Sequence, residues 1–274
     1  MTLDKNFARR LELAEELAGV SVALAHRKLI ADSRAEVLSV AGGSAIFVDP
    51  GNPVSQCIGC GVLERAAPEE IDQIERFYFA RGNASQIVVS RAFAPELERD
   101  LAARGYQIVE QNLAFYLELP YRNEPRAPEG YEIREVATRE RGRWSEMQSS
   151  IFFADAAQAA AFRPTMELLA ASEGYRTYVA VERATGDFAA GAAIFVSPQL
   201  RVACIAGAAT FPAHRNRGLQ AAMLQRRLAD ATAAGCDLAY MSTLLETTSC
   251  RNAERQGFAR GYERAVMLQP RIAP

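Results

Sequence analysis

The sequence predicts an α/β (α+β) fold with two similar halves, each holding a mixed, mostly antiparallel sheet flanked by helices. Amphipathic helical segments are interspersed with short apolar extended segments along the chain. Turn residues join several extended segments directly, which favours antiparallel pairing. Both halves also end alike. Arg104-Gly105-Tyr106 leads into a strand that stops at Leu119-Pro120, and Gln256-Gly257-Phe258 leads into one that stops at Gln269-Pro270. Such an internal repeat indicates duplication.

The first half, residues 1–120, is expected to contain three helices and four extended segments. The clearest helix has Pro68 at its start, acidic residues in its first turn and Gly82 at its end. A Gly42-Gly43 pair suits a hairpin turn within the first extended segment. The predicted helices are residues 6–27, 68–81 and 94–104, and the extended segments are 35–48, 54–62, 85–90 and 113–119.

A polar segment with two prolines, residues 121–129, predicts a linker. The pattern then restarts and defines a second domain, residues 130–274. Thr185-Gly186-Asp187 marks a hairpin between two of its strands. The expected helices are residues 138–152, 155–171, 216–234 and 249–256, and the expected strands are 130–136, 176–182, 188–197, 201–210, 238–243 and 260–268.

Composition excludes several classes of protein. The chain has 274 residues, a net charge of −2 and 49% apolar residues, which is typical of a globular protein and argues against nucleic-acid binding. No apolar run is long enough for a spanning helix, so we expect no membrane association and a cytoplasmic location. Cys57-x-x-Cys60 lacks a second pair, and His26 and His214 are far apart, so we expect buried thiols and no metal site.

The segment from Ile205 to Leu224 carries the clearest chemistry. A strand of small residues ends at Thr210, a turn with Pro212 follows, and a helix begins near Gly218. The first N–H groups of a helix lack intrahelical partners and, with the helix dipole, favour an anion. Glycine lets a phosphate approach the backbone, and Arg215 and Arg217 add positive charge. The alternative is an ordinary strand–helix junction with solvated arginines.

Pro212-x-x-Arg215-x-Arg217-Gly218-Leu219-x-x-Ala222-x-Leu224 resembles the acetyl-CoA pyrophosphate loop of the GNAT acetyltransferase superfamily, except that Gln220 stands where Gly or Ala is usual. Ser249-x-x-Asn252-x-x-Arg255-x-Gly257-Phe258 is similar to the family's last helix, and the order of elements agrees. The resemblance implies a tandem GNAT protein with a degenerate first domain that lacks this loop. It also implies acetyl-CoA contacts at Ala208, Ala209, Thr210, Arg215, Asn216, Arg217, Gly218, Leu219, Gln220, Ala221 and Asn252.

The catalytic groups are harder to assign. Many relatives place a tyrosine acid one helical turn before the glycine of the Gly-Phe pair, but this chain has Ala253 there. Ser249, Asn252 and Tyr262 are the alternatives, each with a structural explanation: a helix N-cap, a hydrogen-bonding side chain and core packing, respectively. Glu246 is the candidate base because it follows the strand at residues 238–243, although loop glutamates are usually only solvated. His214 adjoins the turn and could assist phosphate binding.

The function implied by the resemblance is transfer of an acetyl group from acetyl-CoA to the amine of a small molecule or peptide. A non-catalytic acyl-CoA-binding module is the alternative, and a relic of the fold without a ligand is a third. A homodimer is compatible with the sequence, and no nucleic-acid or membrane partner is expected. No metal is needed for this chemistry.

Overall fold

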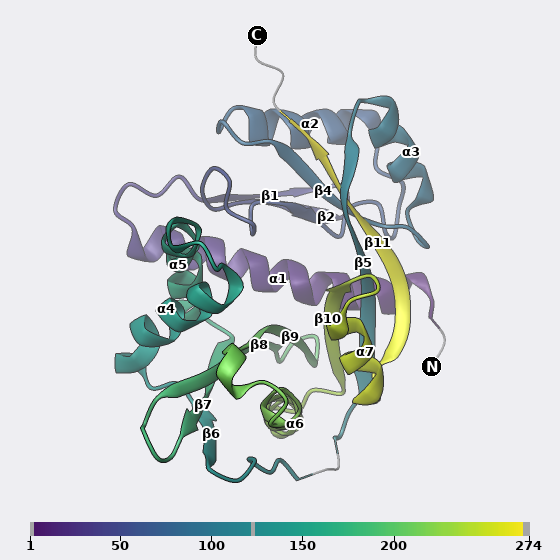
Figure 1. Cartoon of the computed structure of the whole chain (residues 1–274). Coiled ribbons are helices and arrows are strands. Elements are labelled where there is room, and N and C mark those ends of the chain that lie inside the picture. Colours follow the sequence, from purple (N-terminus) through teal and green to yellow (C-terminus); the bar gives the residue numbers. More distant parts are fainter. Residues whose placement is uncertain (1–2, 122–123, 271–274) are drawn as a thin grey trace. The chain divides into compact units, whose positions relative to one another are not determined.

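A computed structural model describes residues 3–121 and 124–270 of the chain. Figure 1 shows its helices and strands. The helices are α1 (Lys5–Leu29), α2 (Pro68–Phe79), α3 (Pro95–Ala103), η1 (Thr138–Glu140), α4 (Arg141–Phe152), α5 (Ala156–Ala171), η2 (Pro212–His214), α6 (Leu219–Ala233) and α7 (Thr248–Arg255). The strands are β1 (Glu36–Val40), β2 (Gly43–Phe47), β3 (Cys57–Ile58), β4 (Ser85–Ser90), β5 (Gln107–Glu118), β6 (Tyr131–Glu135), β7 (Tyr175–Glu182), β8 (Phe188–Ser197), β9 (Val202–Thr210), β10 (Leu238–Leu244) and β11 (Ala259–Gln269).

The chain folds into two compact units. Unit 1 combines Met1–Leu117 with Tyr240–Pro274, and unit 2 is Glu118–Ala239. This grouping reflects packing and does not test the predicted boundary between homologous halves, which stays a prediction. Residues 122–123 of the predicted linker lie outside the described residues. Of the linker's described part, Pro128 accepts a hydrogen bond from the amide of Tyr131 in unit 2.

The sheet of unit 1 has the order β1-β2-β3-β4-β11-β5-β10. Ile87 and Val89 face α2 and α3 in the main core of the unit, whereas Val88 packs with Ile58 and Val266 in a separate cluster. Because side chains alternate along a strand, the second cluster lies on the opposite face. On this opposite face, Ser90 donates a hydrogen bond to Glu12 of α1. Helix α1 therefore covers one face of the sheet, and α2 and α3 cover the other.

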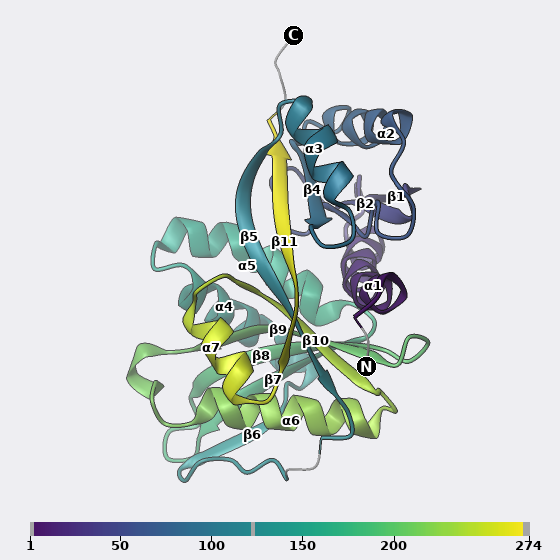
Figure 2. The ribbon, with the colours of Figure 1, turned by 90° about the vertical axis from the view of Figure 1, so that its right-hand side faces the viewer.

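The two strands with similar sequence contexts pair with each other. β5 and β11 run antiparallel and side by side in unit 1 (Figures 1 and 2). β5 ends just before Leu119-Pro120 and β11 just before Pro270, as the internal repeat predicts. Each half thus contributes its closing strand to the same part of one sheet.

Unit 2 contains the order β9-β8-β7-β6, and every pair in it is antiparallel. Helices α4 and α5 form a core with β7 and β8 around the fully buried Trp144. The Trp144 indole donates to the carbonyl of Tyr178 at 2.9 Å, while the Tyr178 hydroxyl donates to Asp230 of α6 at 2.8 Å. The Tyr178 hydroxyl of β7 thus reaches α6, which lies on the face of the sheet opposite to α4 and α5.

Four predicted elements differ from those observed by more than two residues at one end or both. The helix expected from residue 138 starts as η1, and the strand expected at residues 54–62 is limited to β3, because Gly59 and Gly61 take positive φ angles of 80° and 75°. The strand expected from residue 113 begins at Gln107, since pairing with β11 extends it through a mostly exposed segment. The helix expected from residue 216 begins at Leu219.

Candidate functional site

The turn between β9 and α6 is shaped by two residues in the left-handed region. Asn216 has φ +62° and Gly218 has φ +77°. A helix cannot pass through either residue, which is why α6 starts at Leu219 and not at Asn216. Between β9 and these residues the chain forms the short helix η2, closed by a hydrogen bond from the Arg215 amide to the Pro212 carbonyl at 3.2 Å.

Gly218 is the N-cap of α6 and supplies no side chain to the helix N-terminus. The first intrahelical bond at this end joins the Ala222 amide to the Gly218 carbonyl at 3.1 Å. The amides of Leu219, Gln220 and Ala221 precede it, at the end where the helix dipole is positive. A Cβ on Gly218 would find only Pro128 within 4 Å, at 3.7 Å. The N-terminus is therefore open and suits an anion.

The two arginines of the turn each make a hydrogen bond. Arg215 donates from Nε to the Thr210 carbonyl at 3.2 Å, which folds its side chain back onto the end of β9. Arg217 donates to the Tyr131 hydroxyl at 2.9 Å, and the same hydroxyl lies 2.8 Å from Nδ1 of His214. Both arginines remain exposed, so their charges stay close to the open end of α6.

Strand β9 carries a β-bulge just before the turn. Gly191 pairs with Ala209 and Ala193 with Ala206. On β8, one residue, Ala192, separates Gly191 from Ala193. On β9, two residues, Gly207 and Ala208, separate Ala206 from Ala209. Gly207 has φ +60°, a conformation that glycine adopts readily. A bulge interrupts the regular ladder, so backbone groups around Ala208 are turned away from ordinary pairing.

Two buried polar side chains hold this bulge, and neither was predicted from the sequence. Arg227 of α6 is 1% exposed and donates from Nη1 to the carbonyls of Ala193 and Ala206 at 2.9 and 3.0 Å. Gln148 of α4 is fully buried and donates to the Gly207 carbonyl at 2.5 Å. Burial lowers the pKa of Arg227 to about 10. An arginine on the apolar face of α6, between Met223 and Ala231, was the signal that could have revealed it.

The predicted cofactor residues other than Asn252 lie together in unit 2. Ala208 and Thr210 are half-buried and Ala209 is buried on β9. The remaining predicted residues form the turn and the first helical positions, and the Arg215–Thr210 bond joins the two groups. We therefore describe one contiguous surface made of the end of β9, the turn and the start of α6.

The catalytic candidates belong to unit 1, at the end of β10 and on α7. Glu246 is exposed in a turn with φ +60°, and Ser249 is exposed on α7. Asn252 is half-buried and accepts a hydrogen bond from Arg255 at 3.3 Å. The N-cap interpretation of Ser249 is wrong, because the side chain of Thr247 caps α7 by accepting from the Cys250 amide.

Ala253 and Tyr262 are both buried in unit 1. Ala253 is 1% exposed, so the position where relatives carry a tyrosine acid is here a packed methyl group. Tyr262 is 3% exposed, stacks edge-on against Phe93 and donates to Glu12 at 2.8 Å. The core explanation of Tyr262 is therefore confirmed.

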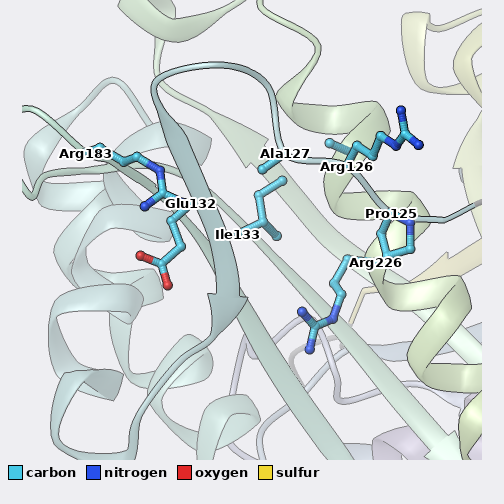
Figure 3. Close-up of a pocket in the computed structure, with 8 residues that line it drawn as sticks. Pro125, Arg126, Ala127, Glu132, Ile133, Arg183 and Arg226 are labelled. Atoms are coloured by element: carbon cyan, nitrogen blue, oxygen red, sulfur yellow. The ribbon is translucent and has the colours of Figure 1, made fainter.

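A pocket of about 160 Å³ lies beside α6 in unit 2 and was not predicted. Figure 3 shows Arg183 next to Glu132, while Arg126 points away from Ile133. Arg183 also donates to the Tyr131 carbonyl at 3.1 Å, and Arg226 pairs with Asp230 at 3.0 Å. The pocket is smaller than the ~300–1,000 Å³ of typical ligand sites. Arg183 and Arg226 also have protein partners already, so the pocket does not indicate a ligand site.

Other predicted features concern thiols, metals and membranes. Cys57 and Cys60 are buried free thiols, as predicted. His26 contacts Ser33 and Asp49, and in residues 3–121 and 124–270 no group of three or more His, Cys, Asp or Glu side chains is arranged to hold a metal ion. Within the same residues, no helix combines the length and apolarity needed to cross a membrane.

Comparison with known proteins identifies the fold. No protein-family model matches the sequence, and no curated protein matches it either. Solved structures do match. A GCN5-related N-acetyltransferase from Kribbella flavida is 17% identical, with a TM-score of 0.66 over 92% of this chain and 95% of that chain. A tandem GNAT protein from the clavulanic acid biosynthesis pathway is 16% identical, with a TM-score of 0.57 over 84% and 74%. A putative GNAT-family acetyltransferase from Novosphingobium aromaticivorans is 18% identical, with a TM-score of 0.54 over 86% and 92%. The chain thus has the fold of GNAT acetyltransferases, in the tandem arrangement.

Proposed function

We propose that this protein is an acetyl-CoA-dependent N-acetyltransferase that acetylates the amine of a small molecule or peptide. The observation that carries the proposal is the open N-terminus of α6, where Gly218 provides no side-chain cap. The backbone amides at this end of α6 would bind the pyrophosphate of acetyl-CoA, with Arg215 and Arg217 adding positive charge. The likeness to GNAT structures supports the fold on which this assignment depends.

Bound acetyl-CoA would supply an activated acetyl thioester. In the transfer, the amine nitrogen of the acceptor forms a bond to the acetyl carbon and loses a proton, while the carbon–sulfur bond breaks and the sulfur gains a proton. Backbone N–H groups at the bulge near Ala208 would polarise the acetyl carbonyl. Arg227 and Gln148 would keep those groups in place, because Arg227 binds the carbonyl of Ala206 just before the bulge and Gln148 binds the carbonyl of Gly207 within it.

We also propose the division into a degenerate domain at residues 1–120, a linker at 121–129 and an acetyltransferase domain at 130–274. Each half contributes one closing strand to the β5–β11 pair, as expected for two copies of one unit. Asn252 of α7 is proposed as a further cofactor contact on the strength of the family resemblance.

Gly218→Trp is expected to abolish stabilisation by acetyl-CoA. The bulky side chain would cover the open N-terminus of α6, and a positive φ disfavours any side chain at this residue. A ligand at a hundredfold excess over Kd stabilises the folded state by about 2.7 kcal/mol, so thermal unfolding with and without acetyl-CoA measures the effect. Gly186→Trp is the matched control, since Gly186 also has positive φ (74°) and no atom within 4 Å of its Cβ position, but lies in the β7–β8 turn.

A thermal shift in the wild type and in Gly186→Trp, but not in Gly218→Trp, supports cofactor binding at this turn. Absence of a shift in the wild type at millimolar acetyl-CoA would overturn the proposal. A shift that persists in Gly218→Trp would place the cofactor elsewhere.

Glu246→Gln tests the proposed general base. Glu246 is exposed at the turn after β10, where it can exchange protons with solvent. Loss of a general base typically lowers the rate about 10²- to 10⁴-fold, so we expect kcat to fall by at least about 100-fold with acetyl-CoA affinity unchanged. Ser249→Ala, assayed in parallel, tests the candidate acid by the same loss, and Asn252→Ala tests whether its hydrogen-bonding side chain contributes to the rate or to acetyl-CoA affinity. An unchanged kcat for Glu246→Gln removes Glu246 from the mechanism.

The alternative function, a non-catalytic acyl-CoA-binding module, is favoured by one observation. Ala253 fills the position of the family's tyrosine acid with a buried methyl group. Such a module would bind acetyl-CoA but release no CoA with any amine in a panel. Measurement of free thiol from CoA in the presence of amines therefore separates the two functions.

A further inference from the structure

A polar cavity of about 390 Å³ lies within unit 1, on the face of the sheet that α1 covers. Strands β4, β5, β10 and β11 (Figure 2) each line it with two residues that are two positions apart, such as Glu110 and Asn112 on β5. Side chains two positions apart share one face of a strand, so the sheet forms the floor of the cavity and Glu15 of α1 adds to its wall. Its volume falls in the ~300–1,000 Å³ range of small-molecule sites.

The cavity borders a buried network of charged groups. Arg264 of β11 is 1% exposed and donates to Glu12 at 3.1 Å, to Glu15 at 2.6 Å and to the Tyr240 hydroxyl at 2.7 Å. Glu12 is fully buried and also accepts hydrogen bonds from Ser90 and Tyr262. The guanidinium is thereby fixed at the cavity by three residues, Glu12 and Glu15 of α1 and Tyr240 of β10.

Two buried polar atoms at the cavity lack a hydrogen-bond partner. One is Nε of Arg264 and the other is Oγ of Ser242. A buried donor that stays unsatisfied destabilises the folded state, and most such groups in proteins have a partner. The orphaned Nε–H is therefore positioned to donate to an oxygen atom of a bound molecule, and the Ser242 hydroxyl can donate to the same molecule or accept from it.

The charge around the cavity identifies the rest of the ligand. Glu15 and Glu110 line the cavity together with Arg264, and Arg264 also pairs with Glu12, so the site holds three carboxylates and one guanidinium. Glu110 accepts a hydrogen bond from the side-chain amide of Asn112 at 2.7 Å. Among the described residues, Glu110 forms no ion pair. A net negative charge at a partly enclosed site attracts a cation and repels an anion.

We propose that this cavity binds a small organic cation, an ammonium compound that also carries hydroxyl groups. The ammonium would pair with Glu110, and a hydroxyl oxygen would accept from Nε of Arg264. Gln86 and Asn112 supply further polar contacts along the floor. The inference goes beyond the proposed function and does not require acetyl-CoA, since every residue that it uses belongs to unit 1.

Titration calorimetry of the full chain, without acetyl-CoA, tests the proposal with ethanolamine and glucosamine as probes and glucose as the neutral counterpart of glucosamine. We expect at least one amine to bind and glucose to bind at least about tenfold more weakly. Glu110→Gln should weaken amine binding by about tenfold or more, because it removes a charge-assisted bond. Leu244→Trp should block the cavity, since Leu244 is a lining residue that is 48% exposed.

Glu263→Gln is the matched control. Glu263 is also an exposed glutamate on this sheet, but it sits next to Arg264 on β11 and so points to the other face. The Nε–H signal of Arg264 in a ¹⁵N correlation spectrum provides a second readout and should move on addition of the amine. Absence of binding by both amines, equal binding of glucose, or an affinity unchanged in Glu110→Gln and Leu244→Trp would overturn the inference. None of these results bears on acetyl-CoA binding, which the Gly218 variant tests separately.

Discussion

Arg264→Met is expected to lower the free energy of unfolding by about 3–5 kcal/mol, the typical loss when one partner of a buried ion pair is removed. The side chain of Arg264 is only 1% exposed. Its guanidinium pairs with Glu12, which is fully buried, and with Glu15. The methionine would fill much of the same volume but would leave the Glu12 carboxylate buried without its counter-charge. Urea unfolding followed by circular dichroism measures the loss.

Two further variants make this result specific. Arg264→Lys keeps the positive charge and should recover part of the stability. Arg260→Met lies on the same strand and removes an ion pair with Glu254 that is exposed to solvent, so it should leave the unfolding midpoint almost unchanged. If Arg264→Met proves as stable as the wild type, the network is not needed to hold α1 against the sheet.

Arg227→Met is expected to have a smaller effect on stability but a large effect on acetyl-CoA binding. Arg227 has no carboxylate within ion-pair distance among the described residues, and burial lowers its pKa to about 10, so its charge is costly in the folded state. Loss of its bonds to Ala193 and Ala206 should cost about 1–3 kcal/mol. Because these bonds hold the Ala193–Ala206 pair that adjoins the bulge of β9, we expect acetyl-CoA affinity to fall by at least about tenfold.

The matched control is Arg226→Met, one residue earlier on α6. Arg226 is half-buried and pairs with Asp230, but among the described residues it makes no hydrogen bond to β9, so its loss should leave cofactor affinity unchanged. Calorimetric titration with acetyl-CoA compares the two variants. Equal affinities for Arg227→Met and wild type would show that the bulge does not position the cofactor, whereas equal losses in both variants would indicate a general effect of charge.

The residues of the turn were predictable because their signals are local. Proline, arginine and glycine at fixed spacing, followed by an amphipathic helix, indicate a helix N-terminus without any knowledge of distant contacts. The same applies to Gly42-Gly43 and Thr185-Gly186-Asp187, whose turns are observed between β1 and β2 and between β7 and β8. The prediction of where α6 starts was wrong by three residues, because the positive φ of Asn216 is decided by the turn and not by its helix propensity.

The sequence by itself determined the order of helices and strands, the position of the turn before α6 and the resemblance to the GNAT fold. Tertiary structure alone decided which residues far apart in the chain meet. Arg227 reaches Ala193 and Ala206, Glu12 reaches Arg264, and β5 pairs with β11. Hydrophobic periodicity indicates which side of a helix or strand is buried but not which other element covers that side. In the sequence, a buried arginine or glutamate cannot be told from a surface residue until its partner is known. The bulge of β9, the network around Arg264 and the cavity beside it all arise from such pairings.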